Sequence, residues 1–220
     1  MMDHHLPHHI SFTFAGGGAV LLDLERDRYL MLRGAEAAAM RALGSARAGT
    51  EDEEAIGRLV ARQLIGQGPG PLVEPIAAPV PAVSALELAG PSERASAIEI
   101  GRYRLEASLG LRLAGLGQTI ARWRNLLAAS QVSAVDPDHR YAAAVARGYA
   151  SARVHLPWRR LCVPDSLALA RFLWRRGIPG ELYFGVRLDP FAAHAWVQLG
   201  DMILSDNVNV VADYTPVFRL

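Results

Sequence analysis

The sequence predicts an α+β protein in which a small module of three strands plus helices precedes a larger domain of mixed helices and strands. Apolar residues alternate in three short runs within the first 32 residues, and a helical period follows them. Six prolines lie between Pro69 and Pro91, which is typical of a linker. We therefore expect a module at 1–68, a Pro/Ala-rich linker at 69–97 and a second domain at 98–220.

The first module contains three strand patterns followed by two helix patterns. The strands are expected at 10–14, 19–24 and 28–32, where apolar residues alternate between short turns rich in glycine or charge. The helices are expected at 35–43 and 51–65, where apolar residues recur at helical spacing. The histidines near the amino terminus are expected to lie in a disordered end rather than in a metal site.

The second domain begins with helices and ends with strands. Helices are expected at 98–128 and 139–154, and a third is expected to begin near Cys162 and to end before Gly177. After Gly177 the apolar period changes from helical to alternating. This change predicts strands at 181–188, 193–199 and 202–206.

Cys162 is the only cysteine in the chain and lies where the third helix of this domain is expected to begin. Pro164 suits a first helical turn, and Asp165 suits the positive end of the helix dipole. Unpaired N–H groups at a helix start favour a thiolate over a thiol and can also hold an oxyanion. A buried, inert cysteine is the alternative interpretation.

His194 and Asp206 follow on the expected strands and would complete a nucleophile, base and orienter. The register of the hairpin decides whether they meet. A two-residue turn at Gly200–Asp201 would send the Asp206 side chain to the opposite face from His194. A three-residue loop or a bulge would pair the two residues directly. Asp201 and Asp213 remain alternative third members.

Composition excludes several functional classes. The net charge is +1, so no bulk electrostatic attraction to nucleic acid is expected. All 23 basic residues are arginine, which excludes a Schiff-base lysine and a Walker lysine. No motif indicates a metal or an organic cofactor. The chain shows neither a signal peptide nor an apolar run long enough for a membrane span, so a cytoplasmic protein is expected.

Four short runs in the last third of the chain match a known family. They are Cys162 with Ser-Leu-Ala-Leu at 166–169, Arg-Arg-Gly-Ile at 175–178, Gly-Val at 185–186 and His-Ala-Trp-Val at 194–197. The region from about 140 to 220 thereby resembles the transglutaminase-like cysteine peptidases called B proteins in lasso-peptide biosynthesis. The resemblance implies a papain-like, transglutaminase-type domain that removes the leader from a ribosomal precursor peptide. It implies Cys162 as nucleophile, His194 as general base and Asp206 as orienter.

The first module matches a second element of such pathways over roughly residues 8–68. The matching runs lie at 19–32 and 59–65. The module resembles the winged-helix-like precursor-recognition element, in which the leader peptide adds to the third strand and packs on the last helix. The resemblance implies a peptide-binding set of Arg28, Tyr29, Leu30, Met31, Leu32, Ile56, Leu59, Val60 and Gln63. The alternative is that these residues complete one larger fold.

The resemblance also implies partners: the precursor peptide and a separate ATP-dependent, asparagine-synthetase-like cyclase. Two other functions stay open at this point. One is a different acyl-transfer enzyme with the same three residues, of the transglutaminase or N-acetyltransferase type. The other is a peptide-binding adaptor whose cysteine is structural. Product mass distinguishes the first alternative, and the reactivity of the thiol distinguishes the second.

Overall fold

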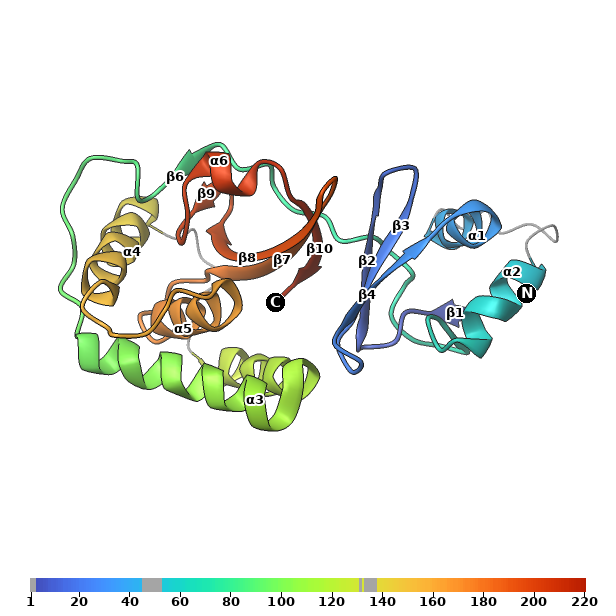
Figure 1. The fold of residues 1–220 in the computed structure, drawn as a ribbon, viewed down its shortest axis with the longest axis horizontal. Coiled ribbons are helices and arrows are strands. Elements are labelled where there is room, and N and C mark those ends of the chain that lie inside the picture. The colour runs from blue at the N-terminus through green and yellow to red at the C-terminus, as the bar shows by residue number, and fades with distance from the viewer. Residues whose placement is uncertain (1–2, 45–52, 131, 133–137) are drawn as a thin grey trace.

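The computed structural model describes residues 3–44, 53–130, 132 and 138–220, which form an α+β protein in two packed parts (Figure 1). The first part consists of β1 (His4–His5), β2 (Ile10–Ala15), β3 (Gly18–Asp23), β4 (Arg28–Leu32), α1 (Gly34–Gly44), α2 (Glu53–Ala61) and β5 (Gly66–Gln67). The second consists of β6 (Val83–Ser84), α3 (Ala97–Ala128), α4 (His139–Arg153), α5 (Cys162–Trp174), β7 (Glu181–Leu188), β8 (Phe191–Leu199), β9 (Met202–Ile203), α6 (Val208–Val211) and β10 (Thr215–Arg219).

The first part contains the three predicted strands as an antiparallel sheet in the order β2-β3-β4. Gly16 and Gly17 form the turn between β2 and β3, with φ angles of 57° and 75°. A two-residue hairpin turn of this kind needs positive φ at both positions, which glycine adopts without a steric cost. β4 pairs with β3 only, so it forms one edge of this sheet within the described part of the chain.

The structure corrects two expectations for this part. α2 ends at Ala61 rather than at residue 65, because Gln63 adopts a left-handed φ of 58°. The N–H groups of Gln63 and Leu64 donate back to the carbonyls of Val60 and Leu59, which closes a Schellman cap. The expected start of this helix, at 51–52, lies outside the described residues. The expected disordered terminus is wrong for β1, which pairs with β5.

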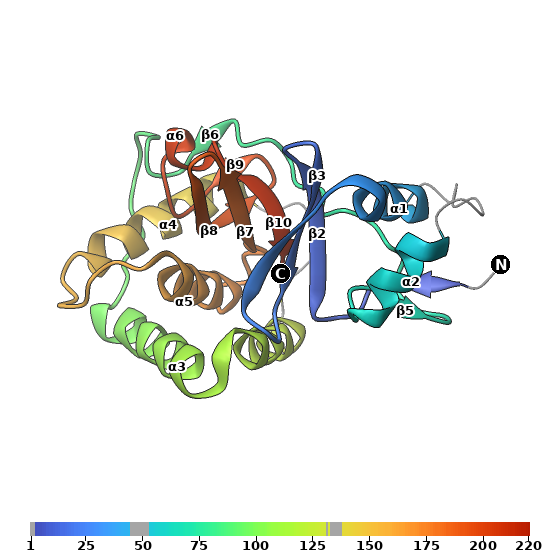
Figure 2. The same ribbon diagram turned by 45° about the vertical axis from the view of Figure 1, so that its right-hand side comes forward.

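The sheet of the first part is buried on both faces. Ala19 and Leu21 of β3 point to one face and pack with α1 and α2. Val20 and Leu22 point to the other face and join the core of the second part. Figures 1 and 2 show this sheet standing between α1 and α2 on one side and β10 on the other, and β10 lies against β2 and β3. The first part is therefore packed onto the second through a shared apolar interface.

The second part is built on a five-stranded sheet in the order β10-β7-β8-β9-β6. The strand β6 comes from the segment predicted to be a linker, and it pairs in parallel with β9. Arg147 on α4 holds the chain that follows β6 by donating to the carbonyls of Ala85 and Pro91. The Pro/Ala-rich segment thus contributes a strand to the sheet that carries the candidate site.

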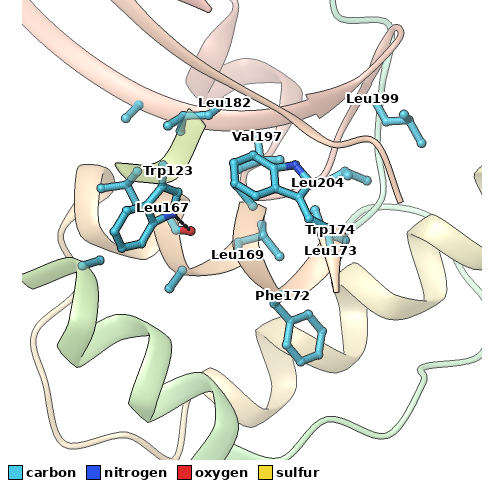
Figure 3. Close-up of a cluster of buried hydrophobic side chains, with 14 of the residues drawn as sticks. Trp123, Leu167, Leu169, Phe172, Leu173, Trp174, Leu182, Val197, Leu199 and Leu204 are labelled. Atoms are coloured by element: carbon cyan, nitrogen blue, oxygen red, sulfur yellow. Dashed lines mark hydrogen bonds between the residues drawn. The ribbon is translucent and has the colours of Figure 1, made fainter. Parts of the chain in front are cut away.

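Helix α5 lies between this sheet and α3, and its apolar residues occupy the centre of the core (Figure 3). Trp123 of α3 is fully buried and donates its indole N–H to the Leu167 carbonyl at 2.9 Å. Trp174 at the end of α5 donates to the Gly180 carbonyl at 2.8 Å. Buried tryptophans need such partners, and these two fix α5 at both ends of its apolar face.

Helix α3 confirms the expected long helix and is interrupted at Gly115. This residue has a φ of 78° and a ψ of 178°, so the two halves of α3 run at an angle to each other. A glycine adopts this conformation without the cost that a Cβ would add. No helix in the described ranges, α3 included, has the length and apolar character that crossing a membrane would require.

We predict that Gly148→Ala destabilises the protein while Gly57→Ala does not. A Cβ at Gly148 in α4 would overlap the Glu93 backbone carbonyl, and the space around Gly57 in α2 is open. Overpacking costs about 1–3 kcal/mol, whereas alanine in an open helical position gains about 0.5–1 kcal/mol. Urea unfolding measures both. Equal stabilities for the two variants would contradict the packing of residue 93 on α4.

Candidate active site

Cys162 is the first residue of α5, as the sequence predicts. Asp165 caps this helix start, because its carboxylate accepts the Leu161 backbone N–H at 2.7 Å. The unpaired N–H groups of the first turn point out of the amino-terminal end of the helix, and the helix dipole adds positive potential there. The sulfur of Cys162 therefore lies where an anion is favoured.

His194 lies on β8 and faces the start of α5. Its hydrogen bond with the Cys162 side chain is the largest influence on the thiol, and it lowers the pKa of Cys162 against the opposing effect of burial. The Ala195 backbone N–H lowers this pKa further. Burial alone would lower the pKa of His194, but Asp206 and Cys162 together raise that pKa to about 9. The two shifts thus favour the thiolate and the imidazolium over the neutral pair.

A buried hydrogen bond sets the distance between these two elements. The Ser166 hydroxyl, one turn into α5, donates to the Ala195 carbonyl of β8 at 2.9 Å. Ser166 is buried, and Ala195 is the residue that follows His194. The donor lies one helical turn from Cys162, and the acceptor lies one residue from His194. This bond therefore holds the thiol and the imidazole in a fixed relative position. Ser166 is part of the run 166–169 that matches the family, but nothing in the sequence indicates its bond to β8.

Asp206 lies beside His194, although the turn has the tight register that was expected to separate them. Leu199 pairs with Met202, so Gly200–Asp201 is a two-residue turn. Oδ1 of Asp206 is nevertheless 3.4 Å from Nε2 of His194, an ion-pair contact rather than a well-formed hydrogen bond. The expectation that a longer loop or bulge is required is therefore wrong.

The reason is that β9 ends early. After Ile203 the Ser205 side chain takes the place of a backbone acceptor, because its hydroxyl accepts the Val197 N–H at 3.0 Å. The chain bends at 204–206, so the strict alternation of a strand no longer decides where Asp206 points. Asp206 thereby turns back to the face that carries His194.

Two serines that the sequence analysis missed hold Asp206. The Ser205 hydroxyl donates to Oδ2 of Asp206 at 2.6 Å. The Ser84 hydroxyl of β6 donates to the Asp206 backbone carbonyl at 2.7 Å. Ser205 could have been found as the neighbour of the candidate aspartate. Ser84 could not, since it is 122 residues away in a segment with no periodicity.

A charged cluster positions the chain before Cys162. Asp165 Oδ1 accepts from Nε of Arg104 at 3.0 Å and from Nε of Arg153 at 2.6 Å, and both guanidinium groups are buried. Arg153 also donates to the Trp158 carbonyl at 3.1 Å. Two buried cations share one carboxylate here, so the cluster keeps an excess of one positive charge beside the helix start. This arrangement fixes residues 158–161 and with them the position of the thiol.

A comparison of the sequence with models of protein families agrees with the geometry of this site. The model described as the Transglutaminase-like superfamily matches residues 106–219, which is 114 of the 220 residues and includes Cys162, His194 and Asp206. The chain belongs to this superfamily.

A segment of this transglutaminase-like chain also resembles a named protein. Over 49 residues it is 41% identical to the Microcin J25-processing protein McjB of Escherichia coli. That segment is 22% of this chain and 24% of McjB, so the chain spans about a quarter of the relative that it matches. No solved structure matches the chain significantly.

The transglutaminase-like site opens into a cavity of about 210 Å³. Cys162, His194, Ser205 and Asp206 line it. The rest of its lining includes Leu86, Tyr149, Ala150, Arg153, Arg160 and Leu161. A small segment of an extended peptide fits a space of this size beside the sulfur. The alternative third members lie elsewhere: Asp201 is in the Gly200–Asp201 turn, and Asp213 is exposed and 3.8 Å from Arg187.

The expected peptide-binding residues divide into two groups. Leu32 and Leu59 are almost fully buried, so these two belong to the core and not to a binding surface. The others remain accessible along β4 and α2: Arg28, Tyr29, Leu30, Met31, Ile56, Val60 and Gln63. Gln63 lies beyond the end of α2, where its side-chain oxygen accepts from the Arg26 guanidinium at 2.7 Å. The accessible edge of β4 is thus supported from behind by the buried leucines.

We predict that Asp206→Asn lowers the pKa of His194 from its value of about 9. The carboxylate and its charge raise that pKa, and an amide provides neither. Nuclear magnetic resonance of the histidine ring signals measures the titration, and a His194→Gln variant assigns the signal. Asp201→Asn is the matched control and should leave the titration unchanged. An unaltered His194 titration in Asp206→Asn would contradict the pairing.

Proposed function

We propose that this chain is a cysteine peptidase that removes the leader from a ribosomal precursor peptide during lasso-peptide maturation. The observation that carries the proposal is that Cys162 at the start of α5, His194 on β8 and Asp206, 3.4 Å from the imidazole, line one cavity. The lowered pKa of Cys162 and the pKa of about 9 of His194 agree with it. A structural cysteine needs neither a basic partner nor a place on the wall of a cavity. The similarity of one segment to McjB, named for processing microcin J25, supports a peptide substrate.

The proposed first step forms a thioester. The Cys162 thiolate attacks the carbonyl carbon of the scissile bond, and the developing oxyanion lies near the N–H groups that begin α5. The His194 imidazolium gives its proton to the departing amine, which is the new amino terminus of the core peptide. The leader is then joined through its last carbonyl to the sulfur of Cys162.

The proposed second step releases the leader. Neutral His194 takes a proton from water, and the resulting hydroxide attacks the thioester carbonyl. The thiolate leaves, and the leader departs with a free carboxylate. Asp206 has a positioning role throughout, because it holds the imidazole and stabilises its charged form. Ser205 and Ser84 hold Asp206 in turn.

We further propose that the leader binds along β4. A strand edge without a strand partner offers main-chain N–H and C=O groups to an extended peptide. The half-buried side chains of Leu30, Ile56 and Val60 lie on the part that would contact it. The proposed cyclase partner, an ATP-dependent asparagine-synthetase-like enzyme, rests on the family resemblance and would act on the core peptide released here.

We predict that Cys162→Ala abolishes leader removal and keeps leader binding. The nucleophile is lost, whereas β4 and α2 are untouched, so the rate should fall at least about 1,000-fold. The substrate is a precursor peptide from a reading frame beside the gene. Mass spectrometry follows cleavage, and fluorescence anisotropy of a labelled leader follows binding.

The controls separate the alternatives. Ser151→Ala, an exposed change on α4, should cleave like the wild type. After hydrolysis the masses of the two products add up to the mass of the precursor plus one water. An acyltransferase would instead join the leader to an amine. Cleavage by Cys162→Ala at a rate near that of the wild type would refute the peptidase proposal. Binding without cleavage by the wild type would indicate an adaptor instead.

A further inference from the structure

Strand β4 faces both parts of the molecule. Leu30 and Leu32 point toward α1 and α2 and pack with the core of the first part. Tyr29 and Met31 point the other way and pack against the core of the second part. The strand proposed to take the leader therefore also presents side chains to the domain that carries Cys162.

The tip of the β7–β8 hairpin meets these side chains. Leu188, at the end of β7, lies against Gly16 beside Met31. Phe191, at the start of β8, contacts Tyr29 edge to face with 5.8 Å between the ring centroids. Phe191 remains 58% exposed and Tyr29 is half-buried, so the two rings form an apolar surface that is still open to a ligand.

This surface lies close to the nucleophile and apart from the cavity. Phe191 precedes His194 by three residues on the same strand. Tyr29 and Cys162 pack against the same core, that of the second part, and burial followed by the charge of Cys162 raises the pKa of Tyr29 to about 12. Of the described residues that line the cavity, none comes from β4 or from the first three positions of β8. The two rings therefore form a surface separate from the cavity.

The order of leader and core in the precursor peptide assigns a part of the substrate to each of these two surfaces. In a precursor peptide the leader comes before the core, so a leader bound along β4 must bring its carboxyl end to Cys162. Tyr29 belongs to β4, and its ring contacts Phe191 of β8, the strand that carries His194, so the two rings connect the leader-binding strand with the strand of the catalytic histidine. The core peptide follows the scissile bond, and the cavity lined by Cys162 and His194 is the separate surface that remains for its first residues.

We infer that Tyr29 and Phe191 form a specificity subsite that selects an apolar side chain among the last residues of the leader. This inference rests on the proposed function and adds the side-chain chemistry that the site selects. Apolar contact with two aromatic rings favours an apolar side chain over a polar one of equal size. The cavity takes the first residues of the core peptide.

Peptidyl chloromethyl ketones test the subsite without the natural substrate, because they occupy the acyl side of the site and alkylate Cys162. The probes are acetyl-Xaa-Ala and acetyl-Ala-Xaa chloromethyl ketones in which Xaa is leucine or asparagine, a matched pair of similar size without charge. The wild type should react about tenfold faster with leucine than with asparagine at one of the two positions. Phe191→Ala and Tyr29→Ala should each reduce this preference to less than threefold, while Tyr29→Phe keeps it.

Iodoacetamide, which has no side chain to select, is the reference reagent. Its rate at Cys162 is measured in every variant, each chloromethyl ketone rate is divided by it, and neither rate should change in Leu113→Ala, a control exposed on α3. A wild type that shows no preference for leucine, or a preference that survives in Phe191→Ala, overturns the subsite. Phe191 is mostly exposed, so this variant decides the question even if Tyr29→Ala fails to fold. A wild type whose Cys162 is inert to iodoacetamide refutes the proposed peptidase, which is a separate outcome.

Discussion

The contact between Cys162 and His194 depends on how α5 packs against β8. The hydrogen bond from Ser166 to the Ala195 carbonyl joins the two elements one turn from the thiol and one residue from the imidazole. The indole groups of Trp123 and Trp174 fix the same helix from the side of α3 and from its carboxyl end. A shift of α5 by one residue would rotate Cys162 away from β8, since successive helical residues differ by about 100°. The core packing therefore sets the chemistry of the site.

The charges of Cys162 and His194 make the stability of the fold depend on pH. The pKa of His194 is about 9 in the folded protein and 6.5 in its ordinary state. Its protonation therefore stabilises the fold fully below about pH 6.5, and this contribution is lost as the pH rises through 9. The pKa of Cys162 moves in the opposite direction, so its thiolate contributes at high pH and is lost on acidification. The charged pair exists at pH values above the lowered pKa of Cys162 and below the raised pKa of His194.

The sequence predicted those features of the fold that depend on residues close together in the chain. The Gly16–Gly17 turn, the start of α5 at Cys162 and the strands of the β7–β8 hairpin follow from residues close in the chain. The position of Asp206 did not follow, because a Ser205 side chain replaces a backbone acceptor and ends the alternation. Nor did strand β6 or Ser84, since a two-residue strand leaves no period and its partner β9 is more than 100 residues away. The buried arginines that hold Asp165 were hidden because they lie on two other helices, 61 and 12 residues away in the chain, and only the packing of those helices brings them together.

We propose that Cys162 and His194 form a thiolate–imidazolium pair prepared for acyl transfer. The most direct test is the rate of alkylation of Cys162 by iodoacetamide between pH 4 and pH 10, in the wild type and in His194→Gln. The rate in the wild type should rise at a pH well below the ordinary thiol range of about 8.5, and His194→Gln should return the rise to that range. A wild-type profile centred near pH 8.5 and unchanged by His194→Gln would contradict the account.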